Sequence, residues 1–484
     1  MEEENVVMGP PGPPPDTSMG YSRCKADQSR NIASKRQNRS MLRTLFIFLI
    51  PLLLSNALQS TSGTVGSIFI GRFIGVRALA ALSSFFPLLF LLISFLIGLG
   101  SGSTVLIGQA YGAGRYDRMK AVVGTTLTAT FVLGAVLAVL GGLFTTQVLR
   151  LMGTPADIEG MAAGFSRIMF WGLPIMFVYI VYTTFLRGSG DSKTPFYFLV
   201  VSTIISLLLY VLFIPGWFGL PRLGLNGAAY ASILGPLSTL VLMLVYLHRT
   251  KHPLGLDREV RRHLGVDWGM LKTLVKIGVP TGIQMINVSL SEVAVVTLVN
   301  GFGSNATAAY GAYYQVANYV QMPAVSMGIA ASVFGAQAIG AGRTGQIRDV
   351  IRDALKLNYV IGGLLMVFCY GFAREILSLF LTDPVPLDIA YRLLMITLWS
   401  YLILGNTQVL AGIMRAGGTV LGPTILSIVT IWGVEIPIAY VLSRHIGVDG
   451  IWVGYSASFV AGLCLQYLYY RLFWRQREHR ALIS

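Results

Sequence analysis

Two carboxylates in apolar surroundings are the residues of this sequence best placed to do chemistry. Of the 21 Asp and Glu residues, only Glu292 and Glu435 lie in the interior of long apolar runs. An ionised carboxylate in such a place costs about 3 kcal/mol or more, so it is a candidate for function by default. Burial favours the protonated form of a carboxyl group, which suits each Glu to accept and release a proton. The alternative is that each is permanently protonated, hydrogen-bonded and structural.

Polar and aromatic side chains recur near these carboxylates at helical spacing. Gln284 and Ser289 precede Glu292 by eight and three residues, which places them on the same side of a helix, and Trp432 precedes Glu435 by three. The other candidates are Tyr310, Tyr314, Asn318 and Gln321 in one stripe, and Trp399 and Asn406 in another. Aromatic and polar groups beside a carboxylate suit a lipophilic cation. Packing between membrane helices explains any single one of them equally well.

The composition indicates that these residues belong to a membrane protein. The 484 residues are 54% hydrophobic and 12% charged, with a mean hydropathy of +0.67, whereas soluble proteins carry about 25% charged residues. A transmembrane helix needs about 20 apolar residues, and twelve such runs occur. They cover residues 44–71, 79–108, 121–148, 161–186, 195–215, 225–247, 275–299, 308–336, 353–373, 389–414, 421–443 and 450–470. We therefore predict an all-α integral membrane protein.

The formal net charge of +15 reports orientation. With a cytoplasmic N-terminus, 28 of the 36 Lys and Arg fall in cytoplasmic segments and 6 in outer segments. This asymmetry follows the positive-inside rule and predicts a multi-pass protein of the cell membrane with both termini in the cytoplasm. No base-reading or phosphate-binding motif accompanies the charge, so we expect no nucleic-acid partner.

An internal repeat divides the chain into two halves. At an offset of 228 residues, Gln109-Ala-Tyr-Gly-Ala-Gly-Arg115 matches Gln337-Ala-Ile-Gly-Ala-Gly-Arg343. Duplication of a six-span unit predicts two bundles related by a pseudo-two-fold axis along the membrane normal, which suits alternating access. We predict a disordered basic tail (1–43), an N-lobe (44–247), a cytoplasmic linker (248–274), a C-lobe (275–471) and a C-terminal tail (472–484).

The repeated motifs resemble the MATE (multidrug and toxic compound extrusion) family of prokaryotic type. They are Gly71-Arg72 at the end of the first run, Ala-Ala-Leu at 80–82, the Gly-Gln-Ala motif after the second run, Arg-Gly-Ser-Gly-Asp-Ser-Lys-Thr-Pro at 187–195 and Trp432-Gly-Val-Glu-Ile-Pro437. The resemblance covers about residues 44–471. It implies a secondary active antiporter that exports organic, often cationic compounds in exchange for H⁺ or Na⁺.

The chain departs from the family pattern at its expected cation site. Many prokaryotic members carry an Asp on the first span where this chain has Gly66, and some add one on the fifth span where it has Tyr210. Another branch uses acids on the seventh and tenth spans. Here Glu292 lies about a helical turn from the first of these positions, and Asn406 lies near the second. We hypothesise that the coupling pair occupies the mirrored position in the C-lobe, as Glu292 and Glu435.

Other function classes find little support. The three Cys are scattered, all five His lie outside the apolar runs, and there is no Walker A motif, so we expect no enzyme, no metal site and no cofactor. A lipid-linked sugar flippase of the same superfamily is the main alternative, although such proteins commonly have fourteen spans and a cationic cavity. A membrane-embedded enzyme or a channel lacks a supporting motif. We expect a monomer whose partners are a small organic substrate and the lipid bilayer.

Overall fold

The computed structural model describes residues 18–216, 222–477 and 481–482, and over these residues the chain is helical apart from short connections. Eleven helical segments are long and apolar enough to cross a membrane, and the bent pair α13–α14 supplies a twelfth. This agrees with the twelve predicted runs.

The first half consists of six long helices joined by short turns. They are α1 (Ser18–Phe73), α2 (Val76–Gly112), α3 (Tyr116–Leu151), α4 (Ala156–Gly188), α5 (Lys193–Phe213) and α6 (Gly224–Arg249). Most of their buried apolar side chains form one cluster, in which Phe85, Phe177 and Tyr182 are fully enclosed. The cluster accounts for the association of these helices as one bundle.

The second half repeats this plan with more interruptions. It comprises α8 (Trp268–Asn300), α9 (Ser304–Gly340), α10 (Gln346–Leu357), the π-helix η2 (Asn358–Gly362), α11 (Gly363–Gly371), α12 (Ala373–Ser378), α13 (Pro384–Thr397), α14 (Ser400–Ala416), α15 (Leu421–Thr430), the π-helix η3 (Ile431–Glu435), α16 (Ile436–Ile446), α17 (Asp449–Tyr469) and the π-helix η4 (Tyr470–Trp474). The turns of both halves use glycine at matching positions, because Gly75 and Gly303 have φ values of 106° and 92°. Only glycine adopts such values without strain.

Part of the predicted tail is helical. Residues 1–17 lie outside the described residues, but α1 begins at Ser18, well before the predicted span at 44. The segment from 21 to 43 contains no Gly or Pro and is rich in Lys, Arg and Gln, which are good helix formers. Extending an existing helix also avoids the cost of nucleating a new one.

The tenth span is broken where a continuous helix was predicted. The axes of α13 and α14 differ by 46° at Leu398 and Trp399. On either side of the break, Thr397 Oγ1 donates to the Leu393 carbonyl (2.8 Å) and Ser400 Oγ donates to the Thr397 carbonyl (2.5 Å). Such hydroxyl bonds to the preceding turn compete with the helix ladder and bend helices.

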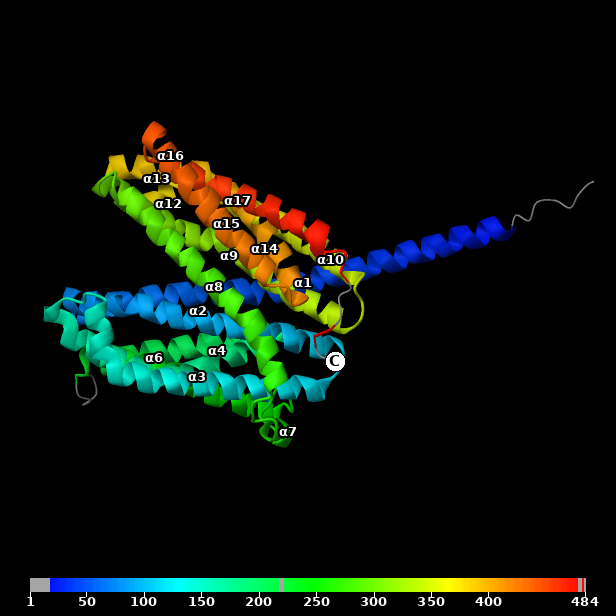
Figure 1. Cartoon of the computed structure of the whole chain (residues 1–484), viewed down its shortest axis with the longest axis horizontal. Coiled ribbons are helices and arrows are strands. Elements are labelled where there is room, and N and C mark those ends of the chain that lie inside the picture. The colour runs from blue at the N-terminus through cyan, green and yellow to red at the C-terminus, as the bar shows by residue number, and fades with distance from the viewer. Residues whose placement is uncertain (1–17, 217–221, 478–480, 483–484) are drawn as a thin grey trace, which may run out of the picture.

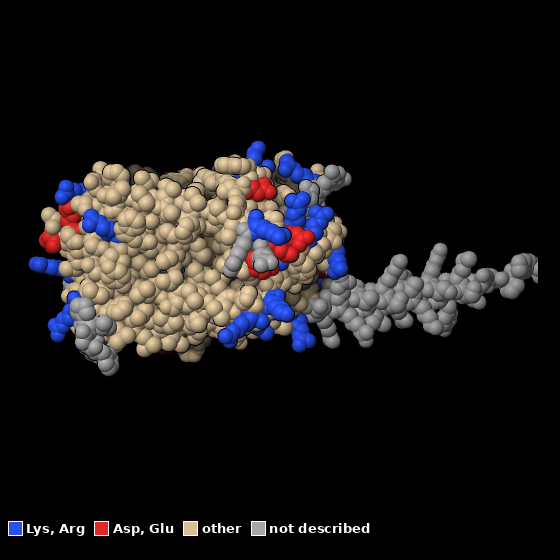
Figure 2. Space-filling view, turned by 90° about the horizontal axis from the view of Figure 1, so that it is seen from below, with Lys and Arg blue, Asp and Glu red and all other residues tan. Residues whose placement is uncertain are grey.

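The two bundles meet at one end and diverge at the other. Figure 1 shows them approaching each other near α10 and the C-terminus and separating toward the opposite end. Figure 2 shows Lys and Arg gathered at the two ends, with a broad uncharged surface between them. This is the surface expected of a protein whose middle lies in lipid.

The closed end is built from repeat-related contacts. Gln109 Nε2 on α2 donates to the Ala416 carbonyl (2.8 Å), and Gln337 Nε2 on α9 donates to the Gly188 carbonyl (3.2 Å). Donors and acceptors are both related by the 228-residue offset. A Cβ atom on Gly112 would collide with the Gln337 carbonyl. The contact therefore relies on glycine for its close approach and uses equivalent groups from both halves.

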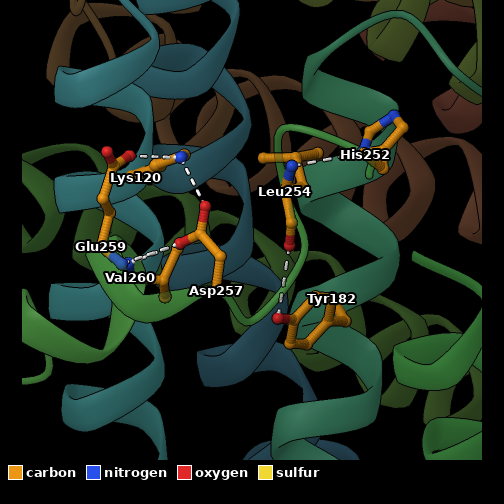
Figure 3. Close-up of polar contacts among 7 residues, drawn as sticks. All are labelled: Lys120, Tyr182, His252, Leu254, Asp257, Glu259 and Val260. Atoms are coloured by element: carbon orange, nitrogen blue, oxygen red, sulfur yellow. Dashed lines mark hydrogen bonds and ion pairs between the residues drawn. The ribbon is translucent and has the colours of Figure 1, made fainter. Parts of the chain in front are cut away.

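The connection between the halves is fastened to the first bundle. It runs from 250 to 267 and contains the short helix α7 (Arg258–Arg262). Lys120 Nζ on α3 pairs with Asp257 Oδ2 (2.5 Å) and with Glu259, and Tyr182 OH donates to the Leu254 carbonyl (3.4 Å) (Figure 3). The linker is thus a docked part of the first bundle up to α7.

Candidate functional site

A polar cavity lies inside the second bundle. It has a volume of about 190 Å³ and is enclosed by α8, α9, α14, α15, η3 and α17. Both carboxylates identified from the sequence, Glu292 and Glu435, line it. No Lys, Arg or His is among its lining residues in the described part of the chain. The electrostatic character of the cavity is therefore set by two acids.

Glu435 is held by hydroxyl groups on both of its oxygens. Ser291 Oγ on α8 donates to Oε1 (2.6 Å), and Ser458 Oγ on α17 donates to Oε2 (3.0 Å). The side chain is only 4% exposed and lies at the end of η3, just before Pro437. Pro437 cannot donate to the preceding turn and its ring crowds that turn, which accounts for the wider π-helical turn. The fold thus presents this carboxylate at a local helix irregularity, where π-turns frequently mark functional sites.

Glu292 is more open to the cavity. Its side chain is half-buried, and Tyr314 OH donates to Oε2 (3.2 Å). It therefore retains more capacity than Glu435 to meet a ligand. Within the described residues no group of three or more His, Cys, Asp and Glu gathers to hold a metal ion. Together the two acids have the donor set for a proton or a sodium ion.

Five tyrosines form part of the cavity wall. Tyr310 OH lies 3.0 Å from Tyr455 OH, and Tyr313 OH lies 2.9 Å from Tyr401 OH. The Tyr310 ring stacks on Trp452, with ring centroids 5.8 Å apart. Because the hydroxyls satisfy one another, the rings are fixed in place. Fixed aromatic faces next to carboxylates provide both cation–π and ionic attraction for an organic cation.

The structure divides the predicted substrate residues into two groups. Five of them line the cavity, and four do not. Those in the cavity are Gln284, Tyr310, Tyr314, Asn318 and Gln321, and those outside it are Ser289, Trp399, Asn406 and Trp432.

Helix irregularities explain why two of these four residues, Trp399 and Trp432, lie outside the cavity. Trp399 lies in the break between α13 and α14, so its helical phase does not continue to Asn406. Trp432 lies within η3, where a π-turn advances less per residue and rotates it away from Glu435. Its Nε1 donates to Asn287 Oδ1 instead (2.8 Å).

The other two residues lie on different faces of regular helices. Asn406 Nδ2 donates to Tyr359 OH (2.6 Å), and Asn406 Oδ1 accepts from Asn358 Nδ2 (3.1 Å). These bonds hold Asn406 toward η2, on the outer side of α14. On α8 the cavity is lined by Gln284, Val288, Ser291 and Glu292 but not by Ser289.

Five residues that bond to Glu435 or form the tyrosine pairs were not predicted from the sequence. They are Ser291, Tyr313, Tyr401, Tyr455 and Ser458. A usable signal existed on the last span, where Tyr455, Ser458 and Gln466 recur at helical spacing in an apolar run. The tyrosine pairs could not be found in this way, because each joins residues from different helices.

The mirrored region of the first bundle contains no carboxylate in its apolar runs. A Cβ at Gly66 would lie 3.5 Å from the Tyr210 ring, so the two family positions do face each other. Tyr210 OH lies 2.8 Å from Ser232 Oγ. The place of the two family carboxylates is thus occupied by the Tyr210 ring and its hydroxyl contact with Ser232.

Comparisons with known proteins agree on one family. The MatE family model matches residues 51–212 and 280–441. The chain is 54% identical over 462 residues to the "Probable multidrug resistance protein YoeA" of Bacillus subtilis, covering 95% of this chain and 100% of that protein. It is 26% identical to the "FAD transporter" of Shewanella oneidensis, covering 82% and 88%.

A solved structure shares the fold. A MATE transporter of Vibrio cholerae, VcmN, superimposes with a TM-score of 0.84 at 21% identity, covering 91% of this chain and 98% of that one. The family resemblance and the predicted all-α membrane fold are both confirmed by these matches.

Proposed function

Because this chain belongs to the MatE family of membrane transporters, we propose that it exports lipophilic organic cations in exchange for H⁺ or Na⁺. The observation that carries the proposal is the cavity of the second bundle, with two carboxylates, five tyrosines and no basic side chain among its lining residues within the described chain. The relative YoeA, at 54% identity, is named a probable multidrug resistance protein, which supports the export of organic compounds.

The charge of the cavity affects which substrates it can bind. The relatives include a protein named FAD transporter, and a dinucleotide carries negative phosphates. A cavity lined by Glu292 and Glu435 would repel such a molecule in the ionised state and attract a cation. We therefore favour cationic substrates over anionic ones for this chain.

We assign the coupling to these two acids. Glu292 faces the cavity with one bonded oxygen and is suited to meet the substrate charge, whereas Glu435 is enclosed by Ser291 and Ser458. Entry of a monovalent ion removes one negative charge from the pair and weakens its hold on the cation, which then leaves. One pH unit supplies about 1.4 kcal/mol, and 100 mV supplies about 2.3 kcal/mol per charge.

The direction of transport follows from the proposed orientation. With both termini in the cytoplasm, the contact of Gln109 and Gln337 closes the cytoplasmic end, and the bundles diverge toward the outside (Figure 1). This is an outward-facing arrangement, in which ions enter and substrate leaves. Rocking of the two bundles as a monomer in the cell membrane would reset the cavity to the cytoplasm.

Transport in proteoliposomes tests the proposal. Efflux of a fluorescent organic cation is measured with an imposed proton gradient and, separately, an imposed sodium gradient. We expect Glu292→Gln and Glu435→Gln each to abolish gradient-driven efflux, while Glu375→Gln, an exposed acid on α12, leaves it unchanged. Full gradient-driven transport by both cavity variants would refute the coupling role and leave the acids structural.

A further inference from the structure

We propose that a groove on the outer side of the second bundle binds an anionic phospholipid of the cytoplasmic leaflet. The groove has a volume of about 1060 Å³ and lies between α10, α14, α17 and η4. Three arginines, Arg348, Arg475 and Arg477, line one part of it. Its other walls are largely apolar, formed by Ile351, Leu355, Leu410, Leu463 and Tyr467.

The arginines lack carboxylate partners within the described part of the chain. None of the ion pairs found there includes Arg348, Arg475 or Arg477. The repeat makes this informative, because the position equivalent to Arg348 in the first half is Lys120. Lys120 is neutralised by Asp257 and Glu259 of the linker (Figure 3). The same place in the fold is thus neutralised in one half and left positive in the other.

The shape of the groove matches a lipid better than a soluble anion. Along α17 and η4 it extends from Leu463 to Trp474, which is at most about 16 Å at the α-helical rise of about 1.5 Å per residue. That is close to one leaflet of a hydrocarbon core about 30 Å thick. Cys464 and Tyr467 are exposed on the side of the bundle, where the membrane surrounds it. A charged head group therefore meets the arginines while an acyl chain lies along the apolar wall.

The groove is separate from the transport cavity. Helix α14 directs Thr407 and Gln408 into the cavity but Leu410 into the groove, and α17 directs Gln466 into the cavity but Leu463 into the groove. An organic cation would be repelled by the three arginines. The bound lipid would instead hold α10 and α17 together at their cytoplasmic ends.

Fluorescence quenching at Cys464 tests the site. Cys369 is buried, so a Cys24→Ser background allows a bimane label to be placed on Cys464 alone. The labelled protein is placed in phosphatidylcholine vesicles with increasing fractions of phosphatidylglycerol or phosphatidylcholine whose chains are brominated. Each arginine near the surface contributes about a fivefold preference. We expect half-maximal quenching by phosphatidylglycerol at a mole fraction at least about tenfold lower than for phosphatidylcholine.

Variants distinguish lipid binding in the groove from a general attraction of anionic lipid to exposed positive charge. In the triple variant Arg348→Gln, Arg475→Gln, Arg477→Gln, the mole fractions that give half-maximal quenching should differ by no more than about twofold between the two lipids. The single substitution Arg477→Glu, at an exposed position, should reduce the preference for phosphatidylglycerol without altering the fold. The matched control changes three exposed arginines of the first half, Arg115→Gln, Arg118→Gln and Arg249→Gln, and should retain the preference.

Three outcomes would overturn the proposal. They are equal quenching by both lipids in the parent protein, a preference that survives the triple change, and competition by inorganic phosphate, which would indicate a free-anion site. Native mass spectrometry of unlabelled protein provides an independent count of retained phosphatidylglycerol. Failure of the cavity variants Glu292→Gln and Glu435→Gln to lose transport would leave this proposal untouched, since it does not depend on the proposed function.

Discussion

Removing the two repeat-related glutamines should open the closed end of the protein. Gln109 donates to the Ala416 carbonyl and accepts the Leu482 N–H (2.7 Å), and Gln337 donates to the Gly188 carbonyl. The double variant Gln109→Ala, Gln337→Ala thus loses three hydrogen bonds between the halves. At about 1 kcal/mol for each bond, the closed arrangement loses about 2–3 kcal/mol, which changes the closed-to-open ratio by roughly 30- to 150-fold.

Spin-label distances provide the assay. Spin labels at Arg115→Cys and Arg343→Cys, in a background without Cys24 and Cys464, report the distance between the two halves at the closed end. This distance is measured by pulsed electron–electron double resonance. We expect the double variant to gain a population at longer distance, and Gln109→Ala alone to have the larger single effect because Gln109 makes two of the bonds.

A matched glutamine serves as the control. Gln147→Ala removes an exposed glutamine of α3 and should leave the distance distribution unchanged. If the double variant keeps the parental distribution and the parental rate of transport, the glutamine bonds do not hold this end closed. The closure would then rest on the packing of α2 against α8 and α9.

Three further changes test the packing and the linker. Gly98→Leu should destabilise the protein by about 1–3 kcal/mol, seen as a lower melting temperature, because its Cβ would collide with the Gly278 carbonyl of α8. Lys120→Met should leave the two linker acids unpaired and increase protease cleavage between 250 and 267, with a cost of about 1 kcal/mol because the acids are partly exposed. Burial holds the pKa of His252 below its ordinary value of 6.5, and its Nδ1 accepts the Leu254 N–H (3.2 Å). The neutral His252 therefore stabilises the linker above pH 6.5, and this stability is lost as pH falls through the lowered pKa. Lowering the pH should increase protease cleavage of the linker in the parent protein. It should not do so in His252→Asn.

Each of these has a control that separates the mechanism from a general effect. Gly63→Ala, on α1, meets nothing within 4 Å and should leave the melting temperature unchanged or raise it. Lys272→Met, an exposed lysine of α8, should leave cleavage of the linker unchanged. Cleavage that rises equally at low pH in the parent and in His252→Asn would remove His252 as the cause.

Much of the architecture could be predicted from the sequence. The twelve apolar runs follow from local composition, and the 228-residue repeat follows from comparing the sequence with itself. Helix length is set by membrane thickness, so hydropathy alone is a sufficient guide to the spans. Glu292 and Glu435 could be found for the same reason, because a carboxylate in an apolar run is conspicuous whatever surrounds it.

The contents of the cavity depended on the tertiary structure. Trp399 and Trp432 were expected beside the acids on the assumption of regular helices, but the break at Leu398 and the π-turn at Ile431–Glu435 rotate them elsewhere. Helix breaks and π-turns result from competition between side chains and the backbone ladder, which a fixed period of 3.6 residues does not include.

The amino-acid sequence alone indicates which runs are apolar enough to cross a membrane, how many such runs there are and which two acids lie within them. Each of these follows from the transfer of single side chains or short runs between water and hydrocarbon. The packed structure was needed to show that Ser291 and Ser458 hold Glu435, that pairs of tyrosines line the cavity and that Gln109 and Gln337 join the two halves. These contacts join residues far apart in the chain, so they depend on how the helices pack, which no local pattern specifies.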